Sequence, residues 1–271
     1  MTFLRSFRAS FVLCLAVCTV HAASAVTLDW DTAAWVNGST NNWFDIDPSR
    51  PGNDVNVRLV GNNGATFASD ITTNPQIQTP AVASVFQGGL AAMERTLVVG
   101  LNLTSNTQSV TLTLDFAAQY PAGIQDLTFR IFDVDYANAN GNTYQDMLTN
   151  IRGLSADGVT WIAPTITTSS ANTLTGTGLG QVVTGTASVV DTGAGSGNGN
   201  VTISFGSAAI TRFEFTYGSG AAFANPTFQH VGFYDFSFTP VPEINPAWTA
   251  MITSFAAVGF VLHRRRAHVR K

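Results

Sequence analysis

The stretch Ser109-Val110-Thr111-Leu112-Thr113-Leu114-Asp115-Phe116 alternates strictly between polar and apolar residues. Successive side chains of an extended chain point to opposite faces of a sheet, so one face of this stretch carries all of its apolar side chains. Val, Thr and Phe also fit the pleated, half-buried surface of a sheet. The stretch therefore predicts a β-strand with one buried face, and it decides the fold class of the chain.

The same period of two recurs along most of the chain. Runs rich in Val, Ile, Thr and Phe predict further strands at 55–59, 96–101, 127–134, 181–190, 201–205, 210–217 and 228–238. Clusters of Gly, Asn and Asp separate these runs, and the Thr- and Gly-rich stretch 165–180 is expected to be a long loop. Because no helical segments alternate with the strands, the pattern predicts an all-β fold, a single antiparallel β-sandwich of the jelly-roll type over residues 26–240.

Charge is scarce and unevenly placed. The 271 residues carry 13 Lys and Arg against 17 Asp and Glu, a formal net charge of −4, and charged residues make up 11% of the chain. Roughly 25% is usual for a globular protein. Seven of the 13 basic residues lie within the first eight or the last eight positions, so the long middle of the chain is acidic. A basic surface for nucleic acid is therefore excluded there, and no nucleic-acid partner is expected.

Residues 1–25 have the three parts of a secretory signal peptide. Arg5 and Arg8 form a short basic region, an apolar run follows at 11–20, and small residues close the segment. The small residues place a cleavage site after Ala25. A retained membrane anchor is the alternative, but ten apolar residues are too few to span a bilayer. The pattern therefore predicts export.

Both cysteines of the chain, Cys14 and Cys18, lie inside this predicted signal peptide. The exported form would then contain no cysteine. Disulfides, thiolate metal sites and cysteine nucleophiles are accordingly excluded from it.

A second hydrophobic segment, residues 244–262, lies near the C-terminus and carries no charged side chain. As a helix rising about 1.5 Å per residue it would reach ~28 Å, close to the ~30 Å hydrocarbon core of a bilayer. We expect one transmembrane helix over 247–262, with the domain outside the cytoplasm; the alternative is a buried C-terminal helix of that domain. The stop-transfer signal after the helix would be Arg264, Arg265 and Arg266.

A short motif begins this C-terminal segment, and it consists of Val241, Pro242, Glu243, Ile244 and Pro246. With the hydrophobic helix and the arginine cluster behind it, the motif resembles the PEP-CTERM sorting signal. Exosortase, a transpeptidase-like membrane enzyme, reads that signal in bacteria that make much exopolysaccharide. The third motif residue is usually Pro. Here Ile244 takes that place and Pro246 follows two positions later, as in the Pro-Glu-Ile-x-Pro variant of such tails.

The resemblance covers about residues 241–271 and implies a sequence of locations. An exosortase-type enzyme would cut near Pro242-Glu243 and release the domain or transfer it to another surface component. The protein would be membrane-anchored first and then a cell-surface or extracellular component associated with exopolysaccharide. More loosely, residues 129–135 with Gln145-Asp146 and the last strand, 231–238, resemble an uncharacterised β-sandwich found ahead of such tails. That resemblance implies a surface domain and no particular activity.

Acidic and amide side chains gather at the end of the predicted strand 127–134. The members of this group are Asp133, Asp135, Asn138, Asn140, Asn142 and Asp146. The first two carboxylates are two residues apart and are expected on the same side of the chain, with oxygen ligands added by an Asn-rich loop. The group is a candidate Ca²⁺ site; the alternative is a turn whose side chains cap its own backbone. Asp45-x-Asp47 with Asn53-Asp54 is a weaker second version.

Three tryptophans lie close together in a polar, Asn-rich context: Trp30, Trp35 and Trp43. Exposed tryptophans stack on the faces of sugars, whereas buried ones fill cores. The three are therefore candidate carbohydrate-binding residues, with a place in the core as the alternative.

Catalytic signals are weak. His230 is the only histidine between the predicted signal peptide and the tail, and it lies in phase with aromatic residues, where a packed histidine is the ordinary outcome. Glu94 and Glu214 are the only glutamates in residues 26–240, and neither lies in a motif. We expect an exported surface or matrix protein without catalytic activity. The alternatives are a carbohydrate-binding module and a carbohydrate-active enzyme that uses Asp133 or Asp135.

Overall fold

The computed structural model describes residues 24–70, 76–91, 93–139, 141–188 and 196–243. All strand pairs in these residues are antiparallel, and the one helical element among them is a 3-10 turn, η1 (Gly178–Gly180). The predicted all-β fold class is confirmed. Most of the predicted signal peptide and the whole predicted transmembrane helix lie outside the described residues.

In the described part of the chain, no helix has the length and apolar character needed to cross a membrane.

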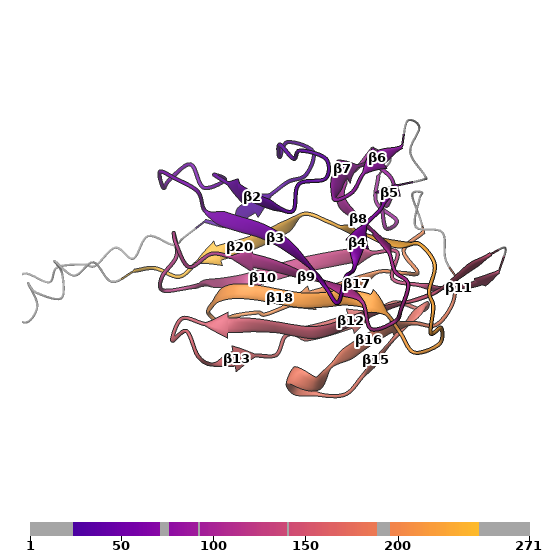
Figure 1. Ribbon diagram of the computed structural model, residues 1–271. Helices are drawn as coiled ribbons and strands as arrows, with labels where there is room; N and C mark the ends of the chain where they lie inside the picture. The colour runs from indigo at the N-terminus through magenta and orange to yellow at the C-terminus, as the bar shows by residue number, and fades with distance from the viewer. Residues whose placement is uncertain (1–23, 71–75, 92, 140, 189–195, 244–271) are drawn as a thin grey trace, which may run out of the picture.

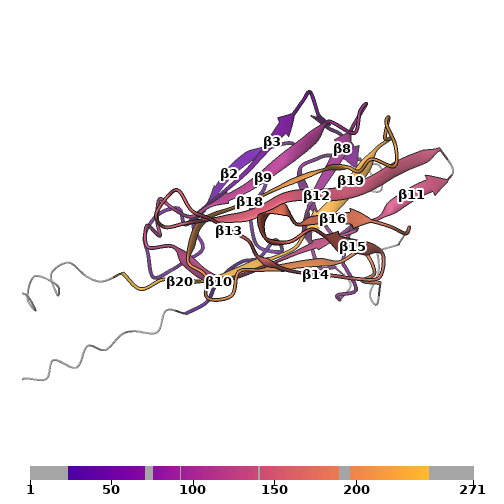
Figure 2. The ribbon, with the colours of Figure 1, turned by 90° about the horizontal axis from the view of Figure 1, so that it is seen from below.

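The strands form two layers that face each other across the core (Figures 1 and 2). The first layer is built on four long strands that are paired in the order β3, β9, β18 and β12. Shorter strands extend it on both sides of this centre. The strands of this layer are β2 (Asn41–Phe44), β3 (Val55–Asn62), β9 (Ser109–Asp115), β11 (Tyr136–Ala139), β12 (Asn142–Ser155), β13 (Trp161–Ile162), β15 (Asn172–Thr175), β16 (Val182–Gly185) and β18 (Ile210–Ser219).

The second layer is centred on β10 (Ile124–Phe132), and its pairing order is β1, β20, β10, β17 and β14. The other strands of this order are β1 (Val26–Leu28), β14 (Thr165–Thr168), β17 (Val201–Ser204) and β20 (Phe236–Pro240). At the end of β10 the pairing passes to β19 (Gln229–Phe233), then to β8 (Thr96–Asn102), and on to β4 (Thr66–Phe67) and β7 (Ala81–Ala83). A separate small pair consists of β5 (Ser69–Asp70) and β6 (Ile77–Gln78).

The two layers belong to one curled sheet, because Ile124 of β10 also pairs with Ile210 of β18. The core lies between the layers. The Phe129 ring of β10 lies 5.6 Å from the Phe213 ring and 6.1 Å from the Phe215 ring of β18, measured between centroids. Burying such rings is favourable by about 25 cal/mol per Å² of apolar surface, so the alternating strands supply the main stabilisation of the fold.

The stretch 109–116 behaves as its pattern predicts. The apolar side chains of β9 are buried and its polar side chains are partly exposed. Strands were also found close to the predicted ranges 55–59, 96–101, 127–134, 201–205 and 210–217. The specific jelly-roll order of strands stays a prediction.

Three local predictions are wrong. The expected loop 165–180 contains β14, β15 and η1, and the long strand β12 was not predicted at all. The run 228–238 is two strands, because the chain breaks at Tyr234 and Asp235 and changes partners from β8 to β1 and β10. In each case pairing with distant strands, which no local pattern records, decides the conformation.

Candidate binding site

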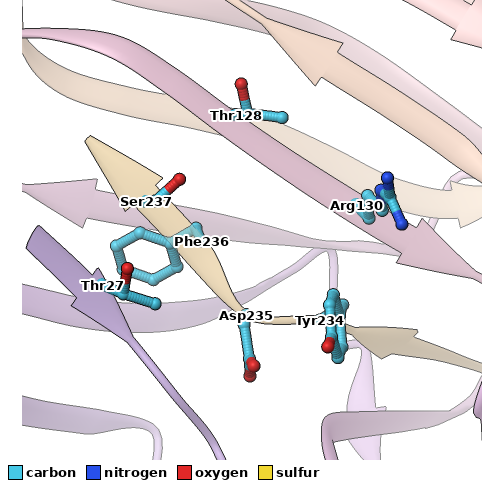
Figure 3. Close-up of a pocket in the computed structure, with 7 residues that line it drawn as sticks. All are labelled: Thr27, Thr128, Arg130, Tyr234, Asp235, Phe236 and Ser237. Carbon is cyan, nitrogen blue, oxygen red and sulfur yellow. The ribbon is translucent and has the colours of Figure 1, made fainter. Parts of the chain in front are cut away.

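A pocket of about 310 Å³ lies on the outer face of the second layer. Figure 3 shows the residues that line it, which come from β1, β10, β20 and the connection between β19 and β20. They are Thr27, Thr128, Arg130, Tyr234, Asp235, Phe236 and Ser237. Six of the seven side chains carry a polar group, so the pocket presents hydrogen-bonding groups around a small apolar floor.

Strand alternation places the β10 residues of the pocket. Phe129 and Ile131 face the core. Thr128, which precedes Phe129, and Arg130, which lies between the two, therefore face outward. The pairing of β10 with β20 shifts register between Gln125 and Thr128, a bulge that brings Thr128 opposite Ser237.

A row of hydroxyl side chains runs from the pocket across five strands. Paired positions on adjacent strands link Thr27, Ser237, Thr128, Ser204 and Thr165. All of them are exposed or partly exposed. Neighbouring strands lie about 4.8 Å apart, so the row offers a hydroxyl at each such step across the sheet.

Asp235 is the acidic group of the pocket. Its Oδ1 accepts a hydrogen bond of 2.9 Å from the backbone N–H of Trp30. Burial raises the pKa of this carboxyl to about 6, with further upward contributions from the charges of Asp29, Asp31 and Glu94. The carboxylate is therefore charged at neutral pH and is neutralised in mildly acidic solution.

Tyr234 is held in place beside Asp235. Its hydroxyl donates a hydrogen bond of 3.0 Å to Oε2 of Glu94, and its ring stacks on Phe132 with centroids 5.2 Å apart. Burial and this bond hold the pKa of the phenol above its usual range, so the hydroxyl remains protonated. Its backbone N–H donates to the carbonyl of Arg130 at 3.0 Å, which joins the β19–β20 connection to β10.

The lining groups can form hydrogen bonds with hydroxyl groups of a ligand. Arg130, an exposed residue, has donors only, and Asp235 has acceptors only when it is ionised, whereas the hydroxyl side chains can donate or accept. Asp235 is the one carboxyl among the lining residues in the described part of the chain.

The carboxyls predicted to hold calcium come together, but inside the protein. Asp133, Asp135 and Asp146 are all buried, and with Tyr144 and Tyr217 they form what we call the Asp146 cluster. Tyr217 donates its hydroxyl to Oδ1 of Asp146 at 2.8 Å, and the backbone N–H of Asp135 donates to Oδ2 at 3.1 Å. Burial, and next the charge of Asp135, raise the pKa of Asp146 well above its usual value.

The amide half of the predicted calcium site lies elsewhere. Asn138 is exposed on β11, whose hairpin with β12 replaces the expected Asn-rich loop, and Asn142 is the exposed first residue of β12. Asn138 as a ligand of the predicted calcium stays a prediction. Asn140 lies outside the described residues.

In the described ranges, no group of three or more His, Cys, Asp or Glu side chains is arranged to hold a metal ion. Calcium at Asp133, Asp135 and Asp146 stays a prediction. Because these carboxyls are buried, they cannot reach a polysaccharide, and this argues against the alternative of an enzyme that uses Asp133 or Asp135.

The predicted tryptophan site is corrected in part. Trp30 is only 1% exposed, and its ring meets Trp35 and Phe44 edge to face with centroids 5.9 and 5.8 Å apart. Trp35 packs partly buried against the core and donates its indole N–H to the carbonyl of Pro80 at 3.0 Å. The buried ring of Trp30 has no open face for a sugar, and Trp35 as a carbohydrate-binding residue stays a prediction. Trp43 is 48% exposed on β2, so its ring remains a candidate for stacking on a sugar.

The other titratable residues singled out in the sequence are engaged in contacts. His230 stacks on Phe86 with centroids 4.5 Å apart, and its Nε2 lies 3.3 Å from Oδ2 of Asp133. Glu214 pairs with Arg152 at 2.6 Å on the first layer. These contacts agree with packing roles.

The first residues of the predicted sorting motif are described. The N–H of Val241 donates to the carbonyl of Gly123 at 3.0 Å, directly after β20 ends. Pro242 and Glu243 are exposed, and Oε1 of Glu243 lies 3.1 Å from Nη1 of Arg50. Ile244, Pro246 and the arginines 264–266 lie outside the described residues.

Sequence reasoning missed the pocket. Arg130, Tyr234 and Asp235 lie within stretches that were predicted as continuous strands. The available signal was the pair of adjacent polar residues, Tyr234 and Asp235, between two apolar runs, since such a pair interrupts strict alternation and marks a strand break.

No family model matches this chain, and no curated protein does. Two solved structures resemble it in outline. One is the family 11 carbohydrate-binding module of the cellulosomal cellulase Lic26A-Cel5E of Clostridium thermocellum, with 11% identity and a TM-score of 0.32, covering 83% of this chain and 99% of that one. The other is a family 11 carbohydrate-binding module from Clostridium thermocellum in complex with a β-1,3-1,4-mixed-linked tetrasaccharide, with 12% identity and a TM-score of 0.34, covering 82% and 99%. At TM-scores this low, neither likeness supports a statement about this chain.

Proposed function

We propose that this is a non-catalytic, exported protein whose β-domain binds a polysaccharide outside the cell, at the pocket formed by β1, β10 and β20. The observation that carries the proposal is the lining of that pocket. An ionised carboxylate, a guanidinium, a tyrosine and three hydroxyls surround about 310 Å³, and a row of hydroxyls continues from it across the sheet. Sugar hydroxyls donate to the carboxylate and accept from the guanidinium, and these charge-assisted bonds are the stronger kind.

The proposed location rests on the two ends of the sequence. The N-terminal pattern is that of a secretory signal, and the C-terminal pattern is that of a hydrophobic anchor with an exosortase-type motif. Pro242 and Glu243 are exposed immediately after the last strand, which leaves them accessible to a processing enzyme. We propose that the protein is first held at the membrane and is then cut near these residues, to remain at the surface beside exopolysaccharide.

The location is tested by mass spectrometry of terminal peptides, recovered separately from membranes and culture medium. A mature C-terminus near Pro242 supports sorting and surface placement. An intact Lys271 in the membrane fraction would overturn the processing step.

Binding is tested on a panel of immobilised neutral and acidic polysaccharides with the purified chain. Asp235→Asn and Arg130→Met are expected to weaken binding about tenfold or more, because a hydrogen bond to a charged group contributes ~1.5–3 kcal/mol. Asp126→Asn and Arg58→Met are matched controls, since both parent side chains are exposed outside the pocket.

Trp43→Ala distinguishes a second candidate surface. Its exposed ring could stack on a sugar without the pocket. If Trp43→Ala abolishes binding while Asp235→Asn and Arg130→Met leave it intact, the pocket is not the site. If no polysaccharide on the panel binds, the proposed function fails.

A further inference from the structure

A second pocket, of about 220 Å³, lies on the outer face of the first layer. The loop before β9 and the strands β9, β12 and β18 form it. Its lining includes the side chains of Asn106, Gln108, Thr149, Asn150 and Thr216, and no charged residue. Uncharged amides and hydroxyls match the hydroxyls of a neutral sugar, since each can donate or accept a hydrogen bond.

The walls of this second pocket are held by hydrogen bonds. Oε1 of Gln108 accepts from the backbone N–H of Thr104 at 2.6 Å, which closes the turn before β9. The backbone N–H of Asn106 donates to the carbonyl of Ala224 at 3.1 Å and ties that turn to the loop between β18 and β19. The pocket is therefore built in advance of binding, which lowers the entropic cost of taking up a ligand.

A local irregularity places Asn150 at the pocket. The pairing of β12 with β18 shifts register between Thr149 and Arg152, and Asn150 there has φ of 51°. Asparagine adopts this left-handed conformation more readily than most residues, and a bulge turns its side chain away from the regular alternation. The Asn150 amide lies 3.4 Å from the hydroxyl of Thr216 at the pocket.

The two pockets lie on opposite faces of the molecule. On β10, Phe129 faces the core and Arg130 faces outward; on β18, Phe215 faces the core and Thr216 faces outward. The rings of Phe129 and Phe215 meet between the layers. The outward residues therefore point in opposite directions, with the core lying between the two layers that Figure 2 shows.

We infer that the domain has two glycan-binding sites, one on each outer face, and that it cross-links two neutral polysaccharide chains. This inference rests on the proposed function, since the first site is the pocket of Figure 3. A single straight chain cannot occupy both faces of the domain. Two chains can, and each domain then becomes a junction in a matrix.

The test is titration calorimetry of the full chain with neutral hexasaccharides of glucose, mannose, galactose and xylose, added one at a time. The expected stoichiometry is two hexasaccharides per chain. Asn150→Gly removes the amide, keeps a residue that tolerates positive φ, and is expected to reduce the number to one. Asp235→Asn is expected to remove the other site, and the double variant to remove both.

Cross-linking is measured separately, as the rise in viscosity of the long polysaccharide that contains the bound hexasaccharide. The parent chain is expected to raise viscosity, and each single variant is expected to bind without raising it. Thr216→Val serves as a second variant should Asn150→Gly lose its near-ultraviolet circular dichroism.

A stoichiometry of one that neither Asn150→Gly nor Thr216→Val changes would overturn the second site and leave the proposed function standing. A stoichiometry of zero with every hexasaccharide, together with no polysaccharide binding on the panel, would overturn both.

Discussion

The two Asp-rich segments of the chain look alike in sequence and differ in how their charge is compensated. Asp47 and Asp54 are buried around the hydroxyl of Tyr120, with Arg50 beside them; we call this group the Tyr120 cluster. The Asp146 cluster also contains buried carboxyls and tyrosine hydroxyls, and its Asp133 lies 3.3 Å from Nε2 of His230, which is charged only when protonated. Tyrosine is thus common to both groups, whereas the neighbouring base is an arginine in one and a histidine in the other.

The pKa values follow this difference. In the Tyr120 cluster, burial acts to raise the pKa of Asp47, but hydrogen bonds from Ser49 and Tyr120 and the charge of Arg50 outweigh it, so the pKa lies below its usual value. In the Asp146 cluster, burial and the charge of Asp135 dominate, and the pKa of Asp146 is raised. Buried carboxylates are therefore stabilising or destabilising according to their donors, and spacing in sequence does not reveal which.

The largest expected effect is the loss of Asp54. Its Oδ2 accepts the backbone N–H groups of Ile46 and Asp47 at 2.7 and 2.6 Å, and its Oδ1 accepts the Tyr120 hydroxyl at 2.9 Å. Asp54→Ala leaves the two backbone N–H groups without this acceptor and leaves the Tyr120 hydroxyl only its longer bond to Asp47, at 3.2 Å. It is expected to lower the free energy of unfolding by about 3–5 kcal/mol, measured by urea denaturation.

Asp45→Ala is the control for Asp54→Ala, because Asp45 is exposed in the same segment. It is expected to change stability by less than about 0.5 kcal/mol. Equal losses in the two variants would show that the segment, and not the Asp54 hydrogen bonds, determines the stability there.

The next prediction concerns calcium at the buried carboxyls of the Asp146 cluster. If Ca²⁺ binds there, excess CaCl₂ is expected to raise the melting temperature by about 5–10 °C relative to EDTA, since a ligand at 100 times its Kd adds ~2.7 kcal/mol. Asp135→Asn is expected to abolish the rise and Asp54→Asn to keep it. A melting temperature insensitive to both CaCl₂ and EDTA removes calcium from this site.

Without calcium, the Asp146 cluster predicts a dependence of stability on pH. The folded state holds the Asp146 proton more tightly than the unfolded chain, so this stabilisation is complete below the ordinary pKa of 3.8 and is lost as pH rises through the raised folded pKa. Asp146→Asn keeps an acceptor for Tyr217 and does not titrate, but it replaces the acceptor of the Asp135 N–H by an amide nitrogen. Its stability is therefore expected to lack the fall with rising pH that the parent shows, about 1.4 kcal/mol for each unit by which the pKa is raised, measured by urea unfolding across pH.

Asp235 contributes with the same sign, and its contribution ends near its pKa of about 6. Comparison with Asp146→Asn separates the two contributions, because the variant keeps Asp235 and lacks the titration of Asp146. Asp126→Asn, at an exposed position of β10, is expected to follow the parent at every pH. A stability difference between the parent and Asp146→Asn that does not change as pH rises above 3.8 contradicts the raised pKa.

The fold was predictable where alternation is strict. β9 was predicted within one residue because its inward and outward faces are chemically distinct. β12 was missed, since Asn142-Thr143-Tyr144-Gln145 begins with four polar or amphipathic residues and only pairing with β11 makes it a strand. Nothing local distinguishes such a segment from a loop.

The site was less predictable than the fold. Sequence reasoning grouped Asp133, Asp135 and Asp146 correctly but placed them at a surface loop, because burial depends on where β12 pairs. Arg130 and Asp235 are more than a hundred residues apart in the chain, and only the pairing of β10 with β20 makes them neighbours of one pocket. Proximity of that kind follows from topology, which single-sequence patterns do not contain.

The smallest expected effect tests the cation that separates the two clusters. Arg50 lies with Nε 4.0 Å from Oδ2 of Asp47 and with its guanidinium 4.9 Å above the centre of the Tyr120 ring. Its side chain is 29% exposed, so solvent screens the charge and Arg50→Met is expected to cost less than about 1 kcal/mol at neutral pH.

The effect of Arg50→Met is expected to depend on pH. Because the pKa of Asp47 is lower in the folded state, its carboxylate stabilises the fold above pH 3.8, and this stabilisation is lost as pH falls through the folded pKa. Removing Arg50 raises the folded pKa of Asp47 toward 3.8 and reduces that loss, so the parent and Arg50→Met should converge in stability in urea unfolding as pH falls from 3.8 through the folded pKa of Asp47. Glu243→Gln separates this effect from the Arg50–Glu243 ion pair, because it removes that pair and leaves the charge beside Asp47. If Glu243→Gln reproduces the whole pH profile of Arg50→Met, Arg50 acts through its ion pair with Glu243 and not on the Tyr120 cluster, and its charge is not what lowers the pKa of Asp47.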